Sequence, residues 1–285
     1  MIDSTITSAR SDAATRSPRA TSGGLLLSTA TLWEREMVRF LRQPSRIAGL
    51  VAAPLLFWLF IGSGLGTSFQ PAASGNDGGS LQYFFPGTVV MIVLFSSIFS
   101  NMSTIEDRRE GFLLSVMVAP IPRAGLVLGK ILGGTTQAMV PGLLFLLLSP
   151  LAGFHLQFGQ VVMAVLVLFL ISISLAGLGF IFAWWMDSTQ GFHAIVNLVL
   201  MPAWVLSGAL FPLSGASSWI RAIMRANPMA YEVEALRSTL GHAASGTIVE
   251  GMSLDRSLEF TALFAILTMV AALLWSGRPT VKHLA

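Results

Sequence analysis

The chain has 285 residues, of which 54% are hydrophobic and 11% are charged, with a formal net charge of +3 and no cysteine. Soluble domains carry about 25% charged residues, so this composition excludes an ordinary soluble protein and indicates an integral membrane protein. The lack of cysteine excludes disulfides, cysteine-based metal sites and thiol catalysis, and the scattered basic residues give no reason to expect a nucleic-acid partner.

The first 24 residues are rich in Ser, Thr, Ala and Arg and show no apolar period. This composition predicts a disordered tail. A targeting peptide is the alternative, but Asp3, Asp12 and the lack of an apolar run before a cleavage site count against it. Residues 277–285 are expected to form a second short tail.

Residues 25–42 predict an amphipathic helix that lies on the membrane surface. One face of this helix would be apolar, with Leu26, Ala30, Trp33, Met37 and Phe40. Another face would carry Ser28, Thr31, Arg35, Arg39 and Arg42. We expect these arginines to point toward lipid headgroups at the cytoplasmic interface.

Six apolar segments are long enough to cross a bilayer, which needs about 20 residues. They are residues 47–66, 84–102, 131–152, 160–184, 193–213 and 258–276. Each must be a helix, because a lipid-exposed segment has to satisfy its own backbone hydrogen bonds. The predicted fold is therefore all-α, with one transmembrane domain of six helices over residues 25–276.

The distribution of positive charge predicts the orientation. Of the 17 Lys and Arg residues, all but Arg221, Arg225, Arg237 and Arg256 fall on the side that holds both termini. Cytoplasmic loops carry the excess of Lys and Arg, so both termini are expected to be cytoplasmic in a multi-pass protein of the inner membrane. The Gly-rich linker over residues 70–82 would then be external.

One cytoplasmic loop interrupts the apolar sequence with "STIEDRREGFLLSVMVAPIPRAGLVLGK", which runs from Ser103 to Lys130. Its composition predicts a helix over residues 105–118 with charges in its first turns. Pro120 and Pro122 would end this helix, because proline cannot continue one. From the residues alone, the segment is either a solvated loop or a projecting element that another protein binds.

"GLVLGK" at the end of this loop resembles a phosphate-binding loop but has the wrong spacing, and Ile131 stands where Ser or Thr is required. We expect Gly125, Gly129 and Gly133 instead to allow the close approach of another helix.

On the external side, residues 214–257 predict two short helices broken at Asn227-Pro228. The first of them, Trp219 to Met224, is apolar enough to re-enter the bilayer.

Several chemistries are not indicated. His155, His193, His242 and His283 are scattered and show no metal-ligand spacing. The predicted spans contain almost no carboxylates, whereas ion-coupled carriers usually keep ionisable groups near the midplane. A membrane enzyme would need clustered His or carboxylates. Asn101, Gln137 and Asn197 could line a path or form hydrogen bonds between helices.

Taken together, residues 25–276 resemble the type-2 ABC transporter permeases, in particular the drug-export and nodulation-factor-export branch. The resemblance is carried by "EDRREGFLLSVMVAPIPRAGLVLGKIL", by "NPMAYEVEALR", and by six spans behind an amphipathic helix. Phe112-Leu113 departs from the family pattern, where many relatives carry a polar or small residue, which affects the register of the loop helix.

The resemblance implies a subunit that is not itself an enzyme and binds no cofactor. Two copies would form the pathway among membrane lipids, and separate ATPase subunits would use ATP and Mg. Glu106 to Val118 would be the coupling helix. The ATPase-coupling interface would comprise Trp33, Arg35, Glu106, Asp107, Arg108, Arg109, Glu110, Gly111, Phe112, Pro120 and Arg123. The external gate would comprise Trp219, Asn227, Pro228, Tyr231 and Arg237.

The expected function is export of a hydrophobic or amphipathic molecule, such as a drug, lipid or glycolipid, by alternating access. One alternative is export of a polysaccharide or lipid-linked glycan. An alternative of another class is a self-contained secondary carrier or channel.

Overall fold

The structure is a computed structural model that describes residues 22–65, 79–118, 121–241 and 253–276. Most of the predicted N-terminal tail, the predicted C-terminal tail, Pro120 and most of the Gly-rich linker lie outside the described residues. The described residues form helices and turns and no strand, which confirms the all-helical prediction.

The longer helices are α2 (Ser22–Leu41), α3 (Pro44–Leu65), α4 (Ser80–Arg109), α6 (Arg123–Leu146), α7 (Phe158–Trp185) and α12 (Leu254–Ser276). The shorter helices are α5 (Phe112–Val118), α8 (Thr189–Ile195), α9 (Met201–Trp204), α10 (Ser218–Ala226) and α11 (Pro228–Thr239).

Five of the six predicted spans correspond to helices long and apolar enough to cross a membrane. They are α3, α4, α7, α12 and the composite segment Thr189–Ala209, which contains α8, α9 and two π-helical turns. The predicted span at residues 131–152 corresponds to α6, which begins at Arg123 and ends at Leu146. The prediction began too late because Lys130 was assigned to the loop on account of its charge. This side chain is in fact buried and neutralised within the protein.

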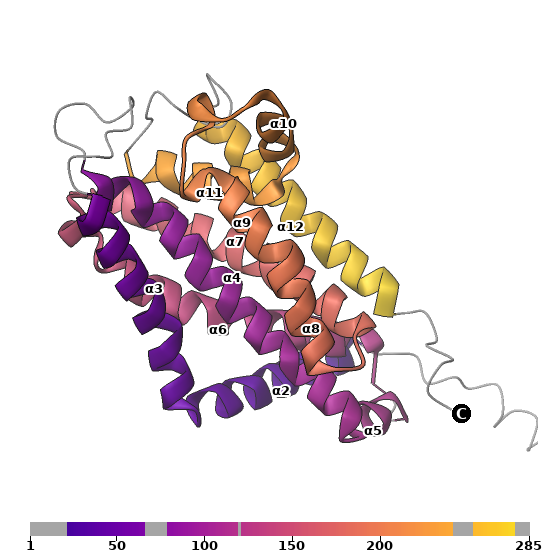
Figure 1. Ribbon diagram of the computed structural model, residues 1–285. Helices are drawn as coiled ribbons and strands as arrows, with labels where there is room; N and C mark the ends of the chain where they lie inside the picture. Colours follow the sequence, from indigo (N-terminus) through magenta and orange to yellow (C-terminus); the bar gives the residue numbers. More distant parts are fainter. Residues whose placement is uncertain (1–21, 66–78, 119–120, 242–252, 277–285) are drawn as a thin grey trace, which may run out of the picture.

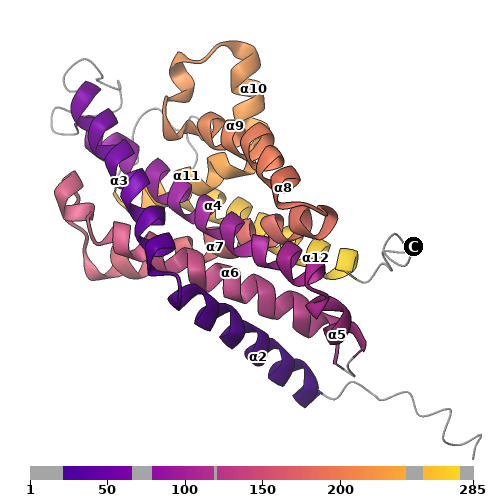
Figure 2. The same ribbon diagram turned by 60° about the horizontal axis from the view of Figure 1, so that its bottom comes forward.

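The helices form a bundle with α4 at its centre, packed against α3, α6 and α7 (Figure 1). α2 and α5 lie at the lower end of the bundle in this view, and α10 and α11 lie at the upper end. A second view shows α2 running alongside α6 (Figure 2). The molecule therefore has two distinct ends, joined by the long helices.

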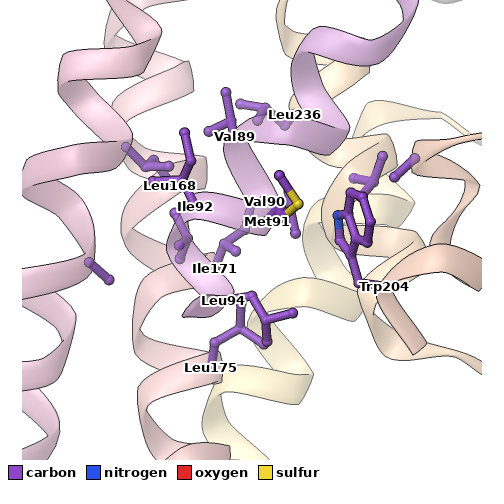
Figure 3. Close-up of a cluster of buried hydrophobic side chains, with 14 of the residues drawn as sticks. Val89, Val90, Met91, Ile92, Leu94, Leu168, Ile171, Leu175, Trp204 and Leu236 are labelled. Atoms are coloured by element: carbon purple, nitrogen blue, oxygen red, sulfur yellow. The ribbon is translucent and has the colours of Figure 1, made fainter. Parts of the chain in front are cut away.

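Apolar residues 89–94 of α4 are all buried, as expected of a helix in the middle of a bundle. Figure 3 shows Ile92 of α4 among Leu168 and Ile171 of α7, while Met91 lies next to Trp204 of α9. The Trp204 indole donates to the Gly87 carbonyl of α4 at 2.9 Å. α4 thus holds the composite segment and α7 in fixed positions.

The contact between α2 and α6 depends on a row of glycines. A Cβ atom added at Gly125 would lie 2.1 Å from Ser28 Oγ, and one added at Gly133 would lie 2.9 Å from Glu36 Cβ. The expected close approach therefore involves α2 and its face with Ser28, Leu32 and Glu36. Of the predicted apolar face, Phe40 is buried against the bundle, whereas Leu26 and Trp33 are exposed. The lipid-facing role of that face stays a prediction. The missed face looked polar in sequence because it carries Ser28 and Glu36.

We expect Gly129→Ala to destabilise the fold by about 1–3 kcal/mol, the usual cost of forcing a methyl group into a packed interface. The new Cβ would lie 2.7 Å from Leu32 Cβ and 3.1 Å from the Thr29 carbonyl oxygen. Thermal unfolding of the detergent-solubilised chain measures the effect. Gly159→Ala is the matched control, because no atom lies within 4 Å of its added Cβ. An unchanged unfolding temperature for Gly129→Ala would contradict this account of the α2–α6 contact.

Candidate functional site

A charged cluster, consisting of Arg35, Glu36, Asp107 and Lys130, lies where α2, α4 and α6 meet. The ammonium group of Lys130 lies 2.6 Å from Glu36 Oε1, also contacts Asp107 Oδ2, and donates to Ser103 Oγ at 3.0 Å. The side chains of Glu36, Asp107 and Lys130 are each at most 3% exposed. The charges therefore satisfy one another inside the protein and tie the three helices together.

Arg35 extends the cluster toward the loop helix. Its guanidinium donates two hydrogen bonds to Asp107, both 2.8 Å long, in the bidentate geometry that makes such pairs strong. The same guanidinium lies over the Phe112 ring, 3.9 Å from its centroid. Arg35 thereby connects α2, the end of α4 and the first residue of α5. The prediction that it faces lipid headgroups was wrong.

Three other arginines at this end also have partners within the chain. Arg39 lies 3.3 Å from Glu106 Oε2. Arg108 donates to the Trp184 carbonyl at 2.7 Å, and Arg109 donates to the Asp187 carbonyl at 3.0 Å. Cations at the end of α7 are favourable, because the last carbonyls of a helix carry partial negative charge.

The loop helix differs from its prediction. Glu106 to Arg109 continue α4 and do not begin a separate helix. The break comes at Gly111, whose φ of +75° places it in the left-handed region that glycine favours. α5 then contains only Phe112–Val118. A run of charges did not end α4, because these side chains find partners while the backbone stays helical.

The exposure of the predicted coupling residues divides them into two groups. Asp107 is buried in the charged cluster, so its assignment to an exposed docking surface was wrong. Arg109, Glu110 and Arg123 are exposed, as is Val118 at the end of α5, whose relative exposure is 87%. Trp33 is partly exposed and its indole donates to Thr136 Oγ1 at 3.0 Å. The exposed members of this set therefore lie at the end of α4, in the turn after it and at the start of α6, and the end of α5 is exposed as well.

At the opposite end, the predicted break at Asn227-Pro228 is confirmed. The Asn227 side chain accepts a hydrogen bond from the Met229 amide and so caps α11, with Pro228 at the first helical position. The same side chain donates to the Ala203 carbonyl of α9. The Tyr231 hydroxyl donates to the Arg225 carbonyl at 2.7 Å. These bonds join α10, α11 and the composite segment.

Arg237 joins α11 to the irregular end of the composite segment. Its guanidinium donates to the Gly208 carbonyl at 2.9 Å, lies 3.5 Å from Glu234 and sits over the Tyr83 ring. Gly208 has φ of +81°, where the helical hydrogen-bond pattern stops. Arg237 is therefore a buried brace between elements. Trp219, in contrast, is 65% exposed on α10.

A buried carboxyl group on α11 was not expected from the sequence. Glu232 is fully buried, and Ser174 in the middle part of α7 is its hydrogen-bond partner. The Ser174 hydroxyl has one proton for two acceptors, Glu232 Oε1 and the Ile171 carbonyl at 2.9 Å. A protonated Glu232 carboxyl resolves this competition, because it donates to the Ser174 hydroxyl while that hydroxyl donates to the Ile171 carbonyl.

We expect Glu232→Gln to keep the stability of the wild type at pH 7 to within about 1 kcal/mol, because an amide can replace a protonated carboxyl as hydrogen-bond donor. Thermal unfolding of the detergent-solubilised chain measures it, with Glu259→Gln on the exposed surface of α12 as control. A marked loss of stability in Glu232→Gln would contradict the assignment of a protonated carboxyl.

Asn101 and Gln137, which could have lined a path or joined helices, form hydrogen bonds between helices. Asn101 of α4 donates to the Ala176 carbonyl of α7 at 3.2 Å, and Gln137 of α6 donates to the Glu36 carbonyl of α2 at 3.3 Å. Of the two interpretations, the packing role is therefore the one observed for these residues.

A cavity of about 720 Å³ opens between α3 and α4, with α9 behind it. Its apolar walls include aromatic and sulfur-containing side chains, among them Phe57, Phe95, Met102 and Trp204. Arg39, Arg46 and Glu106 line the end nearest α2. Its volume is within the range of about 300–1,000 Å³ that small-molecule sites occupy. The cavity was not foreseen, because its lining comes from segments more than 100 residues apart.

Comparisons with known proteins agree with the resemblance found in sequence. The family model described as ABC-2 type transporter matches residues 28–240. A daunorubicin resistance ABC transporter permease, DrrB1 of Streptomyces coeruleorubidus, is 27% identical over 89% of this chain and 88% of its own length. The putative transport permease ycf38 of Cyanophora paradoxa is 26% identical over 80% and 79% of the two chains. Nodulation protein J of Neorhizobium galegae is 24% identical over 76% and 83%.

Proposed function

The chain belongs to the ABC-2 type transporter family and is a permease subunit of an ABC exporter, and we propose that it moves an amphipathic or hydrophobic molecule out of the cell by alternating access. Relatives named for daunorubicin resistance and for nodulation support a substrate of this kind. Permeases of this family work with a separate ATPase subunit. ATP and Mg are then used by that subunit, and this chain binds no cofactor.

In this proposal α6 also crosses the membrane, as the third of six spans in chain order, and the lower end of the bundle in Figure 1 faces the cytoplasm. With 24 residues, α6 has a length of about 36 Å, enough to cross a hydrocarbon core of about 30 Å. Its lower hydropathy comes from the glycines and polar groups that pack against α2 and α4. The excess of Lys and Arg at the α2–α5 end supports a cytoplasmic position for that end and for both termini in the inner membrane.

A second copy of the chain completes the pathway. Large apolar side chains are exposed on the composite segment and on α10, including Leu198 (78%) and Trp219 (65%). In a membrane such side chains contact lipid or another subunit. We place the composite segment and the external helices α10 and α11 near the two-fold axis of a homodimer. α10 re-enters the bilayer edge, and Asn227, Tyr231 and Arg237 hold the outer gate.

The observation that carries the proposal is the link between α5 and the spans. Arg35 contacts both Phe112, the first residue of α5, and Asp107 near the end of α4. A force applied to α5 would therefore reach α2, α4 and, through Lys130, α6. A rigid connection of this kind is what an ATPase bound at the cytoplasmic end requires to change the arrangement of the spans.

Affinity purification of the tagged chain from its native membranes tests the proposal. We expect an ABC ATPase subunit to co-purify in a two-to-two complex that hydrolyses ATP. A chain that purifies without any ATPase, at its native level and in mild detergent, would contradict the proposal.

A further inference from the structure

The cavity between α3 and α4 has a cationic end whose charge is not balanced. The charged cluster is neutral, because Arg35 and Lys130 offset Glu36 and Asp107. Arg39 is offset by Glu106, at 3.3 Å. Arg46 is left over: within the described part of the chain, no carboxylate lies within 4 Å of it, and its guanidinium donates to Gln43 Oε1 at 3.2 Å. Most of its five N–H donors are therefore free to bind an acceptor.

The remainder of the cavity is apolar. Phe57 of α3 stacks edge-on with Trp204 of α9 at 5.9 Å between centroids, and Phe95 and Phe99 of α4 stack at 6.2 Å. Met91 and Met201 also line the cavity, and methionine adapts readily to varied ligand shapes. Figure 3 shows Met91 and the Trp204 indole on the same side of α4. The cavity thus offers one cationic end and one adaptable apolar wall.

We propose that this cavity binds an amphipathic anion, with its headgroup on Arg46 and its apolar part along Phe57, Phe95 and Trp204. The assignment rests on the proposed function and narrows the exported substrate to molecules that carry a phosphate, sulfate or carboxylate group. A guanidinium suits such a headgroup because its fork of donors matches two anionic oxygens. A cationic amphipath could contact the aromatic wall, but it would place its charge beside Arg39 and Arg46.

The test is a binding measurement on the complex of the chain with its ATPase, in phosphatidylcholine nanodiscs without ATP. Dodecyl phosphate is the probe, and dodecyltrimethylammonium has the same tail with the opposite charge. We expect saturable binding of the anion and much weaker binding of the cation. Arg46→Gln should weaken anion binding about ten- to a hundredfold, since a hydrogen bond to a charged group contributes about 1.5–3 kcal/mol. Arg46→Lys should restore part of that loss, which a merely misfolded site would not do.

Arg42→Gln is the matched control, because Arg42 is an exposed arginine of the same corner that does not line the cavity. Its anion affinity should equal that of the wild type. Equal binding of the two probes, or no effect of Arg46→Gln, would overturn the assignment. So would an anionic phospholipid that co-purifies with the complex and stays bound during ATP turnover, because the cavity would then hold a structural lipid.

The substrate class and the exporter function can be tested separately. If ATPase binding and ATP hydrolysis are intact but the anion does not bind, the substrate class is wrong and the exporter function stands. If the anion binds through Arg46 but the ATPase never associates, the exporter function is wrong and the binding site stands.

Discussion

Lys130→Met is expected to destabilise the folded chain by about 3–5 kcal/mol, the range measured when one partner of a buried ion pair is removed. Without the ammonium group, Glu36 loses its 2.6 Å partner while it remains buried. Asp107 would keep only Arg35 and the more distant Arg39. Proteins of this size are stable by only about 5–15 kcal/mol, so the yield of folded protein should fall sharply. Thermal unfolding in detergent and the folded fraction after size exclusion measure the effect.

The double variant Glu36→Gln/Lys130→Met serves as the control for this prediction. It removes one negative and one positive charge together, so it should recover most of the stability lost in Lys130→Met. Arg225→Met, at an exposed basic residue on α10, should leave stability unchanged. If Lys130→Met unfolds at the wild-type temperature, the charged cluster does not hold α2, α4 and α6 together.

Glu110→Lys is expected to weaken binding of the ATPase at least about tenfold and to leave the fold intact. Glu110 is exposed in the turn between α4 and α5, so its reversal costs little in the free chain, where surface ion pairs contribute about 0–1 kcal/mol. A charge that becomes buried on docking has a larger effect, about 2–5 kcal/mol when its partner is lost. Val118→Asp, at the exposed end of α5, should act in the same direction. Pull-down of the ATPase at several concentrations measures the loss.

Variants at α5 and the turn before it differ in whether they disturb the fold as well as ATPase binding. Phe112→Ala would remove the ring beneath Arg35 and disturb the charged cluster, so it tests packing and docking together. Glu110→Lys also adds positive charge on the side proposed to be cytoplasmic, so it reinforces the orientation. Arg225→Glu reverses an exposed charge at the other end and should not affect ATPase binding. Full binding by both Glu110→Lys and Val118→Asp would exclude α5 as the docking element.

Sequence patterns were sufficient for features that depend on near neighbours. Apolar length predicted the existence of the spans, and the capping asparagine with its following proline predicted the break before α11. The positions of the helix ends were less accurate. α4 runs seven residues beyond its predicted end at 102, because its charged last turns are stabilised by partners on other helices.

Features that depend on distant partners were not predictable from composition. Glu36 and Lys130 are 94 residues apart, and Ser174 and Glu232 are 58 apart. One signal was available: Gly125, Gly129 and Gly133 repeat every four residues, as do Ser28, Leu32 and Glu36. Two such rows match when helices pack closely, so the pairing of α2 with α6 and the placing of Glu36 beside α6 could have been inferred.

Reconstitution into liposomes tests the central claim that this chain is a permease driven by a separate ATPase. The two samples are the chain alone and the chain with its co-purified ATPase, each measured with and without ATP and with a proton gradient. We predict ATP-dependent movement of a labelled amphipath by the complex, strongly reduced in Glu110→Lys, and no movement by the chain alone. Transport by the chain alone, driven by the proton gradient, would contradict the account and identify a self-contained carrier.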